Sequence, residues 1–174
     1  MEWMVRKIQD FDPAESRRCL ALLPPERQAK ARPQSLLGEW MVRTALAAQF
    51  GIPPEEVPLL RTEKGKPYTT LPMEFSITHS GDWVAVAFDT EPIGIDLEVR
   101  RPINETLARR LCTEQDLSHL KGDFNLRLLE LWTAKEAYFK RIGTGITNLK
   151  SVSYAELNTY HAVTEDYVLS INRP

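Results

Sequence analysis

The sequence predicts an α+β fold in which two similar α/β lobes repeat one plan. Segments 36–46 (LLGEWMVRTAL) and 128–138 (LLELWTAKEAY) share the pattern Leu-Leu-x-x-Trp-x-x-basic-x-Ala without gaps. Segments 81–88 (GDWVAVAF) and 165–172 (EDYVLSIN) also match, so a helix-like segment precedes a strand-like one in both halves. This repeated order predicts a duplication. The alternative is a coincidence between common amphipathic patterns.

The two halves divide the 174-residue chain into an N-terminal lobe over 1–90 and a C-terminal lobe over 91–174. We expect them to pack with pseudo-twofold symmetry as one compact unit, with the active site in the cleft between them. The length alone is compatible with one domain or with two small fused domains.

The N-terminal lobe begins with a strand of alternating character and continues through two helices. Leu20, Leu22 and Leu23 recur at helical spacing before a Pro-Pro pair ends the first helix, and Gly51 ends the second. A loop rich in Gly and Pro follows. The expected elements are a strand in 1–8, helices in 12–23 and 35–51, a loop at 61–72, and strands at 74–80 and 82–89.

The C-terminal lobe begins with the strand-like segment 91–101 (EPIGIDLEVRR). Segment 103–120 is expected to be helical, with Asn104 as its N-cap. The strongest helical pattern in the chain spans 125–142, and Gly143 is expected to end that helix. The remaining elements are strands at 151–157 and 166–174.

Composition excludes several classes of protein. A net charge of −2 argues against nucleic-acid or membrane-surface binding, although local basic clusters could hold a small polyanion. Charged residues interrupt every apolar run among the first residues, unlike in a signal peptide, and no apolar run reaches 18 residues. Cys19 and Cys112 lie far apart without metal-ligand spacing, so we expect buried free thiols in a soluble, cytoplasmic protein.

Two carboxylates stand out in the strand-like segment 91–101. Asp96 and Glu98 lie two residues apart, so both point to the same face of a strand. Two like charges about 4 Å apart repel by roughly 4 kcal/mol at an effective dielectric of about 20. A cation between them would remove that cost. From the spacing alone, an edge strand with solvated carboxylates explains the pattern equally well.

The strong helix could complete such a site. Glu136 and Lys140 are four residues apart and therefore share a helix face. Glu136 with Asp96 and Glu98 would supply the oxygen ligands that Mg²⁺ prefers, and Mn²⁺ accepts the same ligands. The alternative for Glu136 and Lys140 is an ordinary surface pair. Together with scattered basic residues, the three carboxylates suit a substrate that carries several phosphates.

Four motifs in order give a resemblance to a known family. They are GKP at 65–67, FSITHSGDWVAVAF at 75–88, PIGIDLE at 92–98 and LWTAKEAYFK at 131–140. With these motifs the sequence resembles the 4′-phosphopantetheinyl transferases of the two-lobed, surfactin-synthetase-activating type. The resemblance is clearest over 64–145.

The resemblance implies a Mg²⁺-dependent transferase. Such an enzyme moves the phosphopantetheine arm of coenzyme A to a serine hydroxyl of an apo acyl or peptidyl carrier protein and releases 3′,5′-ADP. It would serve fatty-acid, polyketide or nonribosomal peptide synthesis, and we expect a monomer. The family pattern places the metal on Asp96, Glu98 and Glu136. Glu136 is also the candidate general base, and Lys140 the candidate partner of a phosphate oxygen.

Further residues are assigned to the two substrates. The family pattern carries His79 to the 3′-phosphate of coenzyme A, and the full set for coenzyme A is Arg27, Lys30, Ser35, Lys66, Thr78 and His79. Arg27, Lys30 and Lys66 could instead belong to solvated loops, and His79 could be a hydrogen-bonded structural residue. For the acidic carrier protein we expect a docking face that combines basic and apolar side chains, namely Leu107, Arg109, Arg110, Leu111 and Leu117. A core face beside a solvated face explains that pattern equally well.

Two segments depart from the family pattern. Only ARPQS separates Lys30 from Leu36, and the part after Leu157 is too short for a full hairpin. Two other functions are compatible with the same residues. One is a Mg²⁺-dependent hydrolase of the coenzyme A pyrophosphate, because the site could activate water. The other is a coenzyme A-binding module without catalysis, against which the intact acidic residues argue.

Overall fold

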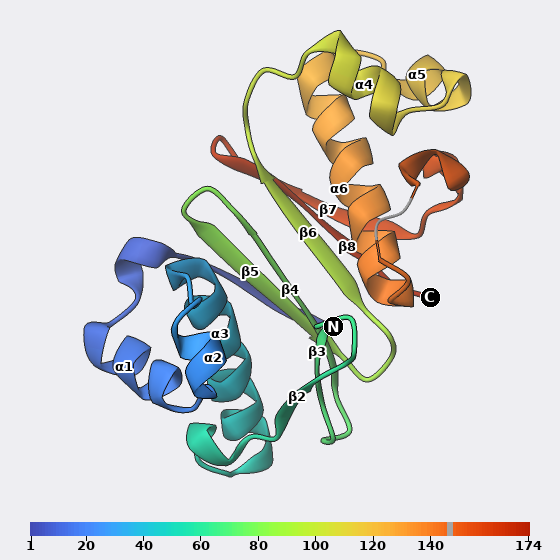
Figure 1. Ribbon diagram of the computed structural model, residues 1–174. Helices are drawn as coiled ribbons and strands as arrows, with labels where there is room; N and C mark the ends of the chain where they lie inside the picture. The colour runs from blue at the N-terminus through green and yellow to red at the C-terminus, as the bar shows by residue number, and fades with distance from the viewer. Residues whose placement is uncertain (146–147) are drawn as a thin grey trace. The chain divides into compact units, whose positions relative to one another are not determined.

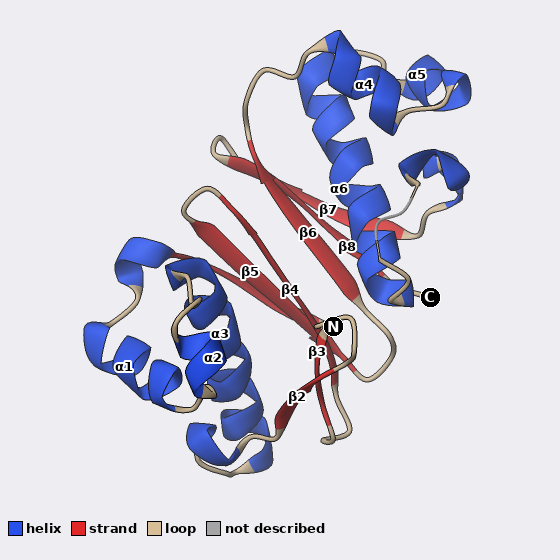
Figure 2. Ribbon diagram, in the orientation of Figure 1, coloured by secondary structure: helices blue, strands red, loops and turns tan. Residues whose placement is uncertain are grey.

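A computed structural model describes residues 1–145 and 148–174 and shows a mixture of helices and antiparallel strands (Figure 1; Figure 2). The α+β class expected from the sequence is therefore confirmed. The chain separates into two compact units, Met1–Thr90 and Glu91–Pro174. Across the part of the chain described, no helix has both the length and the hydropathy needed to cross a bilayer.

The first unit contains two antiparallel sheets and three helices. A three-stranded sheet has the order β1-β5-β4, and β2 pairs with β3 in a short hairpin. The strands are β1 (Glu2–Lys7), β2 (Leu59–Arg61), β3 (Pro67–Thr69), β4 (Glu74–Ser80) and β5 (Trp83–Asp89). The helices are α1 (Pro13–Ala21), α2 (Pro25–Gln28) and α3 (Pro33–Phe50), with 3₁₀ turns at Ile8–Asp10 and Pro54–Glu56.

Helix α3 packs against β4 and β5 and forms the centre of this unit. Leu37, Met41 and Leu46 are buried in its core. Gly38 allows the close approach, because a Cβ there would lie 2.7 Å from Cγ2 of Ile77. The helix ends at Gly51, whose φ of 67° places it in the left-handed region that glycine adopts without strain.

The second unit contains one three-stranded antiparallel sheet of order β6-β8-β7. The strands are β6 (Gly94–Val99), β7 (Thr159–Val163) and β8 (Tyr167–Asn172). The helices are α4 (Glu105–Leu111), α5 (Glu114–His119) and α6 (Phe124–Ile142), with 3₁₀ turns at Leu149–Ser151 and Tyr154–Glu156.

Helix α6 packs against β6 and β8. Gly94 is required at the contact, since a Cβ there would collide with the carbonyl oxygen of Ala137. Lys135 is fully buried, and its Nζ donates to Oδ2 of Asp116 at 2.6 Å and to the carbonyl oxygen of Leu111 at 3.3 Å. This pair ties α4 and α5 to α6. The expected end of α6 at Gly143 is confirmed.

Three expectations about the second unit need correction. Segment 103–120 forms two helices instead of one, because Thr113 starts a new capping box with Asp116. The expected start at Asn104 is confirmed, since its side chain accepts from the N–H of Leu107. Segment 151–157 forms 3₁₀ turns instead of a strand. The part after Leu157 does hold a hairpin, since β7 pairs with β8 in antiparallel register.

The two cysteines are buried free thiols, as expected. Burial raises the pKa of the Cys19 thiol to about 12 and that of the Cys112 thiol to about 11. Both thiols are therefore protonated at neutral pH and act as small apolar side chains.

Candidate active site

Strand β6 and helix α6 bring three of the predicted residues together. Asp96 is buried on β6, where it pairs in register with Ser170 of β8. Nζ of Lys140 on α6 donates to Oδ1 of Asp96 at 2.6 Å. Glu136 lies one turn before Lys140 on the same face of α6. Two carboxylates and an ammonium group thus share one face of the sheet.

A polar cluster lies on the sheet face that Asp96 occupies. Ser170 shares the sheet face of Asp96, because directly paired residues of an antiparallel ladder point the same way. Its hydroxyl oxygen lies 2.5 Å from Oγ1 of Thr133 on α6 and 2.8 Å from Nδ1 of His161 on β7. Burial lowers the pKa of His161, which favours the neutral imidazole. These bonds join β8, α6 and β7.

Glu136 has a raised pKa. Burial is the largest cause, and the Asp96 carboxylate adds to it, as Glu98 does to a smaller extent. Trp132 and Lys140 oppose the increase: Trp132 Nε1 donates to Glu136 Oε1 at 2.7 Å, and Lys140 supplies positive charge. Glu136 therefore experiences the negative charge of both β6 carboxylates.

Glu98 is half-buried and has a different cationic partner. Nη2 of Arg101 lies 3.5 Å from Oε2 of Glu98. The same guanidinium lies over the ring of Trp132, 5.6 Å from its centroid. Arg101 thus contacts one predicted ligand and the tryptophan that holds another. Arg101 was not among the residues predicted from the sequence; its position three residues after Glu98 was the available signal.

The three carboxylates fit a hard cation by ligand type, but they are not gathered into a formed metal centre. Among the residues that the structure describes, no group of three His, Cys, Asp or Glu side chains lies close enough to hold a metal ion. Lys140 and Arg101 instead balance the charges of Asp96 and Glu98. The carboxylate oxygens are the feature that suits Mg²⁺.

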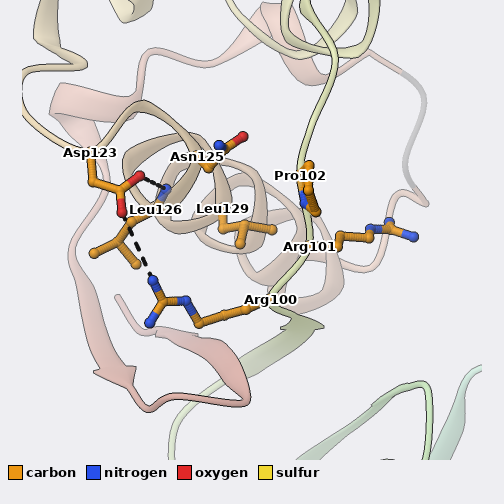
Figure 3. A pocket seen from close by; sticks show the side chains of 7 residues that line it. All are labelled: Arg100, Arg101, Pro102, Asp123, Asn125, Leu126 and Leu129. Atoms are coloured by element: carbon orange, nitrogen blue, oxygen red, sulfur yellow. Dashed lines mark hydrogen bonds and ion pairs between the residues drawn. The ribbon is translucent and has the colours of Figure 1, made fainter.

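A cavity of about 280 Å³ lies where β6 ends and α6 begins (Figure 3). Arg100 and Arg101 line it from the segment after β6; the Arg100 side chain points toward Asp123, and the Arg101 side chain points away from it. Arg100 pairs with Asp123 across 3.9 Å, and Asp123 also caps α6 by accepting from the N–H of Leu126. The residues that line the cavity are Arg100, Arg101, Pro102, Asp123, Asn125, Leu126 and Leu129. Arg101 therefore links this cavity to Glu98.

The residues predicted for coenzyme A all lie in the first unit. Arg27 on α2 donates from Nη2 to Oε2 of Glu39 at 2.8 Å, so its guanidinium is anchored by a buried carboxylate. Lys30 is exposed just after α2. Ser35 caps the start of α3, where its hydroxyl donates to the carbonyl oxygen of Arg32 and accepts from the N–H of Arg32. Its hydroxyl is thus engaged locally.

The other three residues predicted for coenzyme A lie on the β2–β3 hairpin and on β4. Lys66 is half-buried at the tip of the β2–β3 hairpin, where its N–H donates to Oγ1 of Thr62. Thr78 and His79 are consecutive on β4, so their side chains point to opposite faces. Thr78 is buried and His79 is exposed. Of these two residues, His79 is therefore the one whose side chain a ligand can reach.

The expected docking face is only partly at the surface. Leu111 is buried in the core that α4 shares with α6, and Leu107 packs against the same core. The apolar side chains of these two leucines hold α4 in place, and that of Leu111 is buried. Arg109 and Arg110 are exposed, and so is Leu117 on α5.

Comparisons with known proteins match both units. A model of the 4′-phosphopantetheinyl transferase superfamily matches residues 92–167, and one of the N-terminal part of 4′-phosphopantetheinyl transferase matches residues 14–91. The chain belongs to the 4′-phosphopantetheinyl transferase superfamily. The superfamily match includes the whole Asp96, Glu98, Glu136 and Lys140 constellation.

Curated relatives within this superfamily carry the same name. The chain is 33% identical over 147 residues to 4′-phosphopantetheinyl transferase Sfp of Bacillus subtilis, which covers 76% of this chain and 66% of that protein. It is 30% identical to 4′-phosphopantetheinyl transferase psf-1 of Bacillus pumilus, covering 81% and 68%. The match to 4′-phosphopantetheinyl transferase gsp of Aneurinibacillus migulanus has 35% identity and covers 65% and 49%. The chain thus spans about two thirds or less of the relatives it matches.

Proposed function

We propose that the protein transfers the 4′-phosphopantetheine arm of coenzyme A to a serine of an apo carrier protein. The observation that carries this proposal is the Asp96, Glu136 and Lys140 group, held on one face of β6 and α6 within the region that the superfamily model matches. The three curated relatives also support it, because each is named a 4′-phosphopantetheinyl transferase.

The reaction joins the serine oxygen to the phosphorus that bears the pantetheine arm. The phosphoanhydride bond to the nucleotide breaks, and 3′,5′-ADP leaves with the bonding electrons. Glu136 accepts the serine proton, because it is the half-buried carboxylate held in place by Trp132. Lys140, oriented by Asp96, offsets the negative charge that develops on the phosphate oxygens.

Asp96, Glu98 and Glu136 are the residues that would hold Mg²⁺ or Mn²⁺, since they present hard oxygen donors. When bound, the ion would polarise the pyrophosphate of coenzyme A. Lys140 and Arg101 would then exchange part of their contact with Asp96 and Glu98 for contact with substrate phosphates. Coenzyme A would be held by Arg27, Lys30, Lys66 and His79 of the first unit.

Two further assignments belong to this proposal. Arg109, Arg110 and Leu117 form the exposed part of the expected docking face for an acidic carrier protein. Charge reversal at both arginines is expected to raise KM for the carrier; an unchanged KM would remove this assignment. The pseudo-twofold relation of the two units is also a proposal, supported by their shared strand order and the repeated helix motif.

The test is a transfer assay with coenzyme A, Mg²⁺ and several apo carrier proteins, read by intact-protein mass spectrometry. We expect each accepted carrier to gain the mass of one phosphopantetheine arm on its serine. Cleavage of coenzyme A without a mass gain on any carrier would establish a hydrolase instead. Binding of coenzyme A with neither product would establish a non-catalytic binding module.

A further inference from the structure

A row of three side chains crosses the sheet of the second unit and begins at Asp96. Asp96 on β6 pairs in register with Ser170 on β8, and Ser170 pairs with His161 on β7. Directly paired residues point to the same face, so all three share the face on which α6 packs. Neighbouring strands lie about 4.8 Å apart, which places His161 roughly 10 Å from Asp96. The row therefore connects a candidate site residue to a histidine that the proposed reaction does not use.

His161 belongs to a continuous chain of hydrogen bonds. Its Nδ1 lies 2.8 Å from Oγ of Ser170, and its Nε2 lies 3.2 Å from the hydroxyl of Tyr154 in the 3₁₀ turn Tyr154–Glu156. Oγ of Ser170 lies 2.5 Å from Oγ1 of Thr133, which lies 2.8 Å from the carbonyl oxygen of Leu129. Ser170 and Thr133 are fully buried. The chain thus runs from the turn through β7 and β8 into α6.

The chain satisfies all its members in one direction. A carbonyl oxygen can only accept, so Thr133 donates to Leu129 and its own oxygen accepts from Ser170. Ser170 has then donated its one proton and accepts from Nδ1–H of His161, which leaves Nε2 to accept from Tyr154. The reverse direction would remove the bond from Thr133 to Leu129. The bonds therefore select a neutral imidazole with its proton on Nδ1.

The surroundings of His161 also favour the neutral ring. Burial is the largest cause of its lowered pKa; the Glu130 carboxylate on α6 opposes that shift, and the Arg127 guanidinium on α6 adds to it. Tyr154 is the titratable group in contact with the ring, and burial raises its pKa, so its hydroxyl is protonated at neutral pH. Both groups are thus in the protonation states that the chain requires.

Contact between a serine and a histidine is also the pattern of a nucleophile with its general base. Here the serine is fully buried, so a substrate cannot reach its hydroxyl. In the direction derived above, His161 also donates to Ser170 instead of accepting its proton. The pair therefore belongs to the scaffold and forms no second reactive centre.

The chain passes beside both carboxylates of the candidate active site. Ser170 is the direct neighbour of Asp96 across the ladder. Thr133 precedes Glu136 by three residues on α6, so both lie on the same face of the helix. The contact between Ser170 and Thr133 therefore sets the spacing of β8 and α6 close to Asp96 and Glu136. A displacement of about 1 Å in an active site can cost about 10²-fold in rate.

We propose that His161 is a positioning residue, whose neutral Nδ1–H tautomer fixes Ser170 against Thr133 and thereby keeps Asp96 and Glu136 aligned. Its part in the reaction rests on the function proposed above. His161 was not among the residues predicted from the sequence, because it lies outside the motifs that carry the family resemblance.

The first measurement reads the tautomer without any reaction. The chain contains three histidines, so the ¹⁵N-histidine NMR spectrum of His161→Asn identifies the signals of His161 by their absence. At pH 7 we expect a protonated Nδ1 and an unprotonated Nε2. A proton on Nε2, or a ring that averages between the two tautomers, would overturn the proposal.

The second measurement is of kcat and of KM for coenzyme A in the carrier-modification assay. His161→Leu removes both hydrogen bonds of the ring and should lower kcat about tenfold, with KM within about twofold of wild type. His161→Asn keeps a donor near the place of Nδ1 and should recover kcat to within about threefold of wild type.

Tyr160→Leu is the matched control. Tyr160 is the preceding residue of β7, so its side chain points to the opposite face, and it is exposed. We expect this variant to keep the wild-type kcat. Circular dichroism of each variant confirms that the compared proteins are folded.

The dependence of kcat on pH is a readout that a purely structural role would not move. A protonated His161 has two donors and no acceptor, so Tyr154 could no longer donate to it. The ratio of kcat between His161→Asn and wild type should therefore rise as the pH falls below about 6.5, the ordinary pKa of histidine. The two proteins share their other titratable groups, which cancel in this ratio. A ratio that stays constant would contradict the proposal.

The outcomes separate the positioning role from the transferase activity. A folded His161→Leu with the wild-type kcat would overturn the role, even with a lower melting temperature. An Asn variant no more active than the Leu variant would also overturn it. Cleavage of coenzyme A by the wild type without carrier modification would overturn the transferase, and the same comparison of kcat is then made on that cleavage. A wild type with neither activity would overturn both proposals.

Discussion

Helices α3 and α6 occupy the same place in the plans of their units but carry different chemistry. In the sequence, each helix follows the first strand of its sheet and precedes the last two strands. The two sheets have the matching orders β1-β5-β4 and β6-β8-β7. Each also buries a cation at the basic position of the repeated motif. Arg43 binds Glu39 and backbone oxygens, whereas Lys135 binds Asp116 and a backbone oxygen.

The next position of the motif separates the two helices. Thr44 in α3 donates its hydroxyl to the carbonyl oxygens of its own helix, whereas α6 has Glu136 there. The first strands differ in the same way. Met4 pairs with the central strand β5 where Asp96 pairs with β8. The residues that hold the scaffold are thus alike, and the carboxylates proposed for catalysis occur in the second unit.

The largest expected effect is on the transfer rate and concerns Glu136. Glu136→Gln should lower the transfer rate by about 10²–10⁴, the range for loss of a general base, while coenzyme A still binds. Thr44→Val at the matching position of α3 should leave the rate unchanged. Rates by mass spectrometry and affinities by calorimetry check both. Loss of fold in Glu136→Gln, seen by circular dichroism, would show a structural role instead.

The buried cations should matter to stability in both units. Lys135→Met leaves Asp116 buried without its partner and should lower the free energy of unfolding by about 3–5 kcal/mol. Arg43→Met should cost less, about 1–3 kcal/mol, because Glu39 keeps two other arginines and the Val57 carbonyl loses its donor. Urea denaturation measures both. A cost below about 1 kcal/mol at either site would show that the pair is dispensable.

The two helix-contact glycines should differ in cost. A Cβ at Gly94 meets the backbone of α6, which cannot move away, so Gly94→Ala should cost more than about 3 kcal/mol. A Cβ at Gly38 meets Cγ2 of Ile77, a side-chain atom that can shift more readily than a backbone, and alanine also favours the helix by about 1 kcal/mol. Gly38→Ala should therefore cost less than Gly94→Ala in thermal unfolding. The reverse order would contradict the packing described.

The smallest effect concerns pH. Burial alone would raise the pKa of Asp116, but its hydrogen bonds from Lys135, Thr113 and Tyr154 outweigh burial and lower it. A carboxyl group with a lowered pKa stabilises the fold at pH values above its ordinary pKa of about 3.9. This stabilisation is lost as the pH falls through the pKa of the folded state. Urea unfolding from pH 7 to pH 3 should show a shrinking gap between wild type and Asp116→Asn. A constant gap would contradict this assignment.

Local patterns predicted most of the elements and the central group of site residues. Helical spacing and Gly143 defined α6, and alternation placed Asp96 and Glu98 on one strand face. The hairpin β7–β8 was missed because its first strand is short and half-exposed, so its apolar pattern is weak. The break between α4 and α5 was missed because a capping box at Thr113 interrupts a continuous helical pattern.

The sequence by itself determined the family, the α+β class, and the carboxylates of β6 and α6, because these depend on residue type and short-range spacing. Only the tertiary structure decided which charges meet. It paired Lys140 with Asp96 and Arg101 with Glu98, placed Leu107 and Leu111 in the core, and gathered Arg27, Arg43 and Arg61 around Glu39. Such contacts join elements distant in the chain, and local periodicity does not specify them.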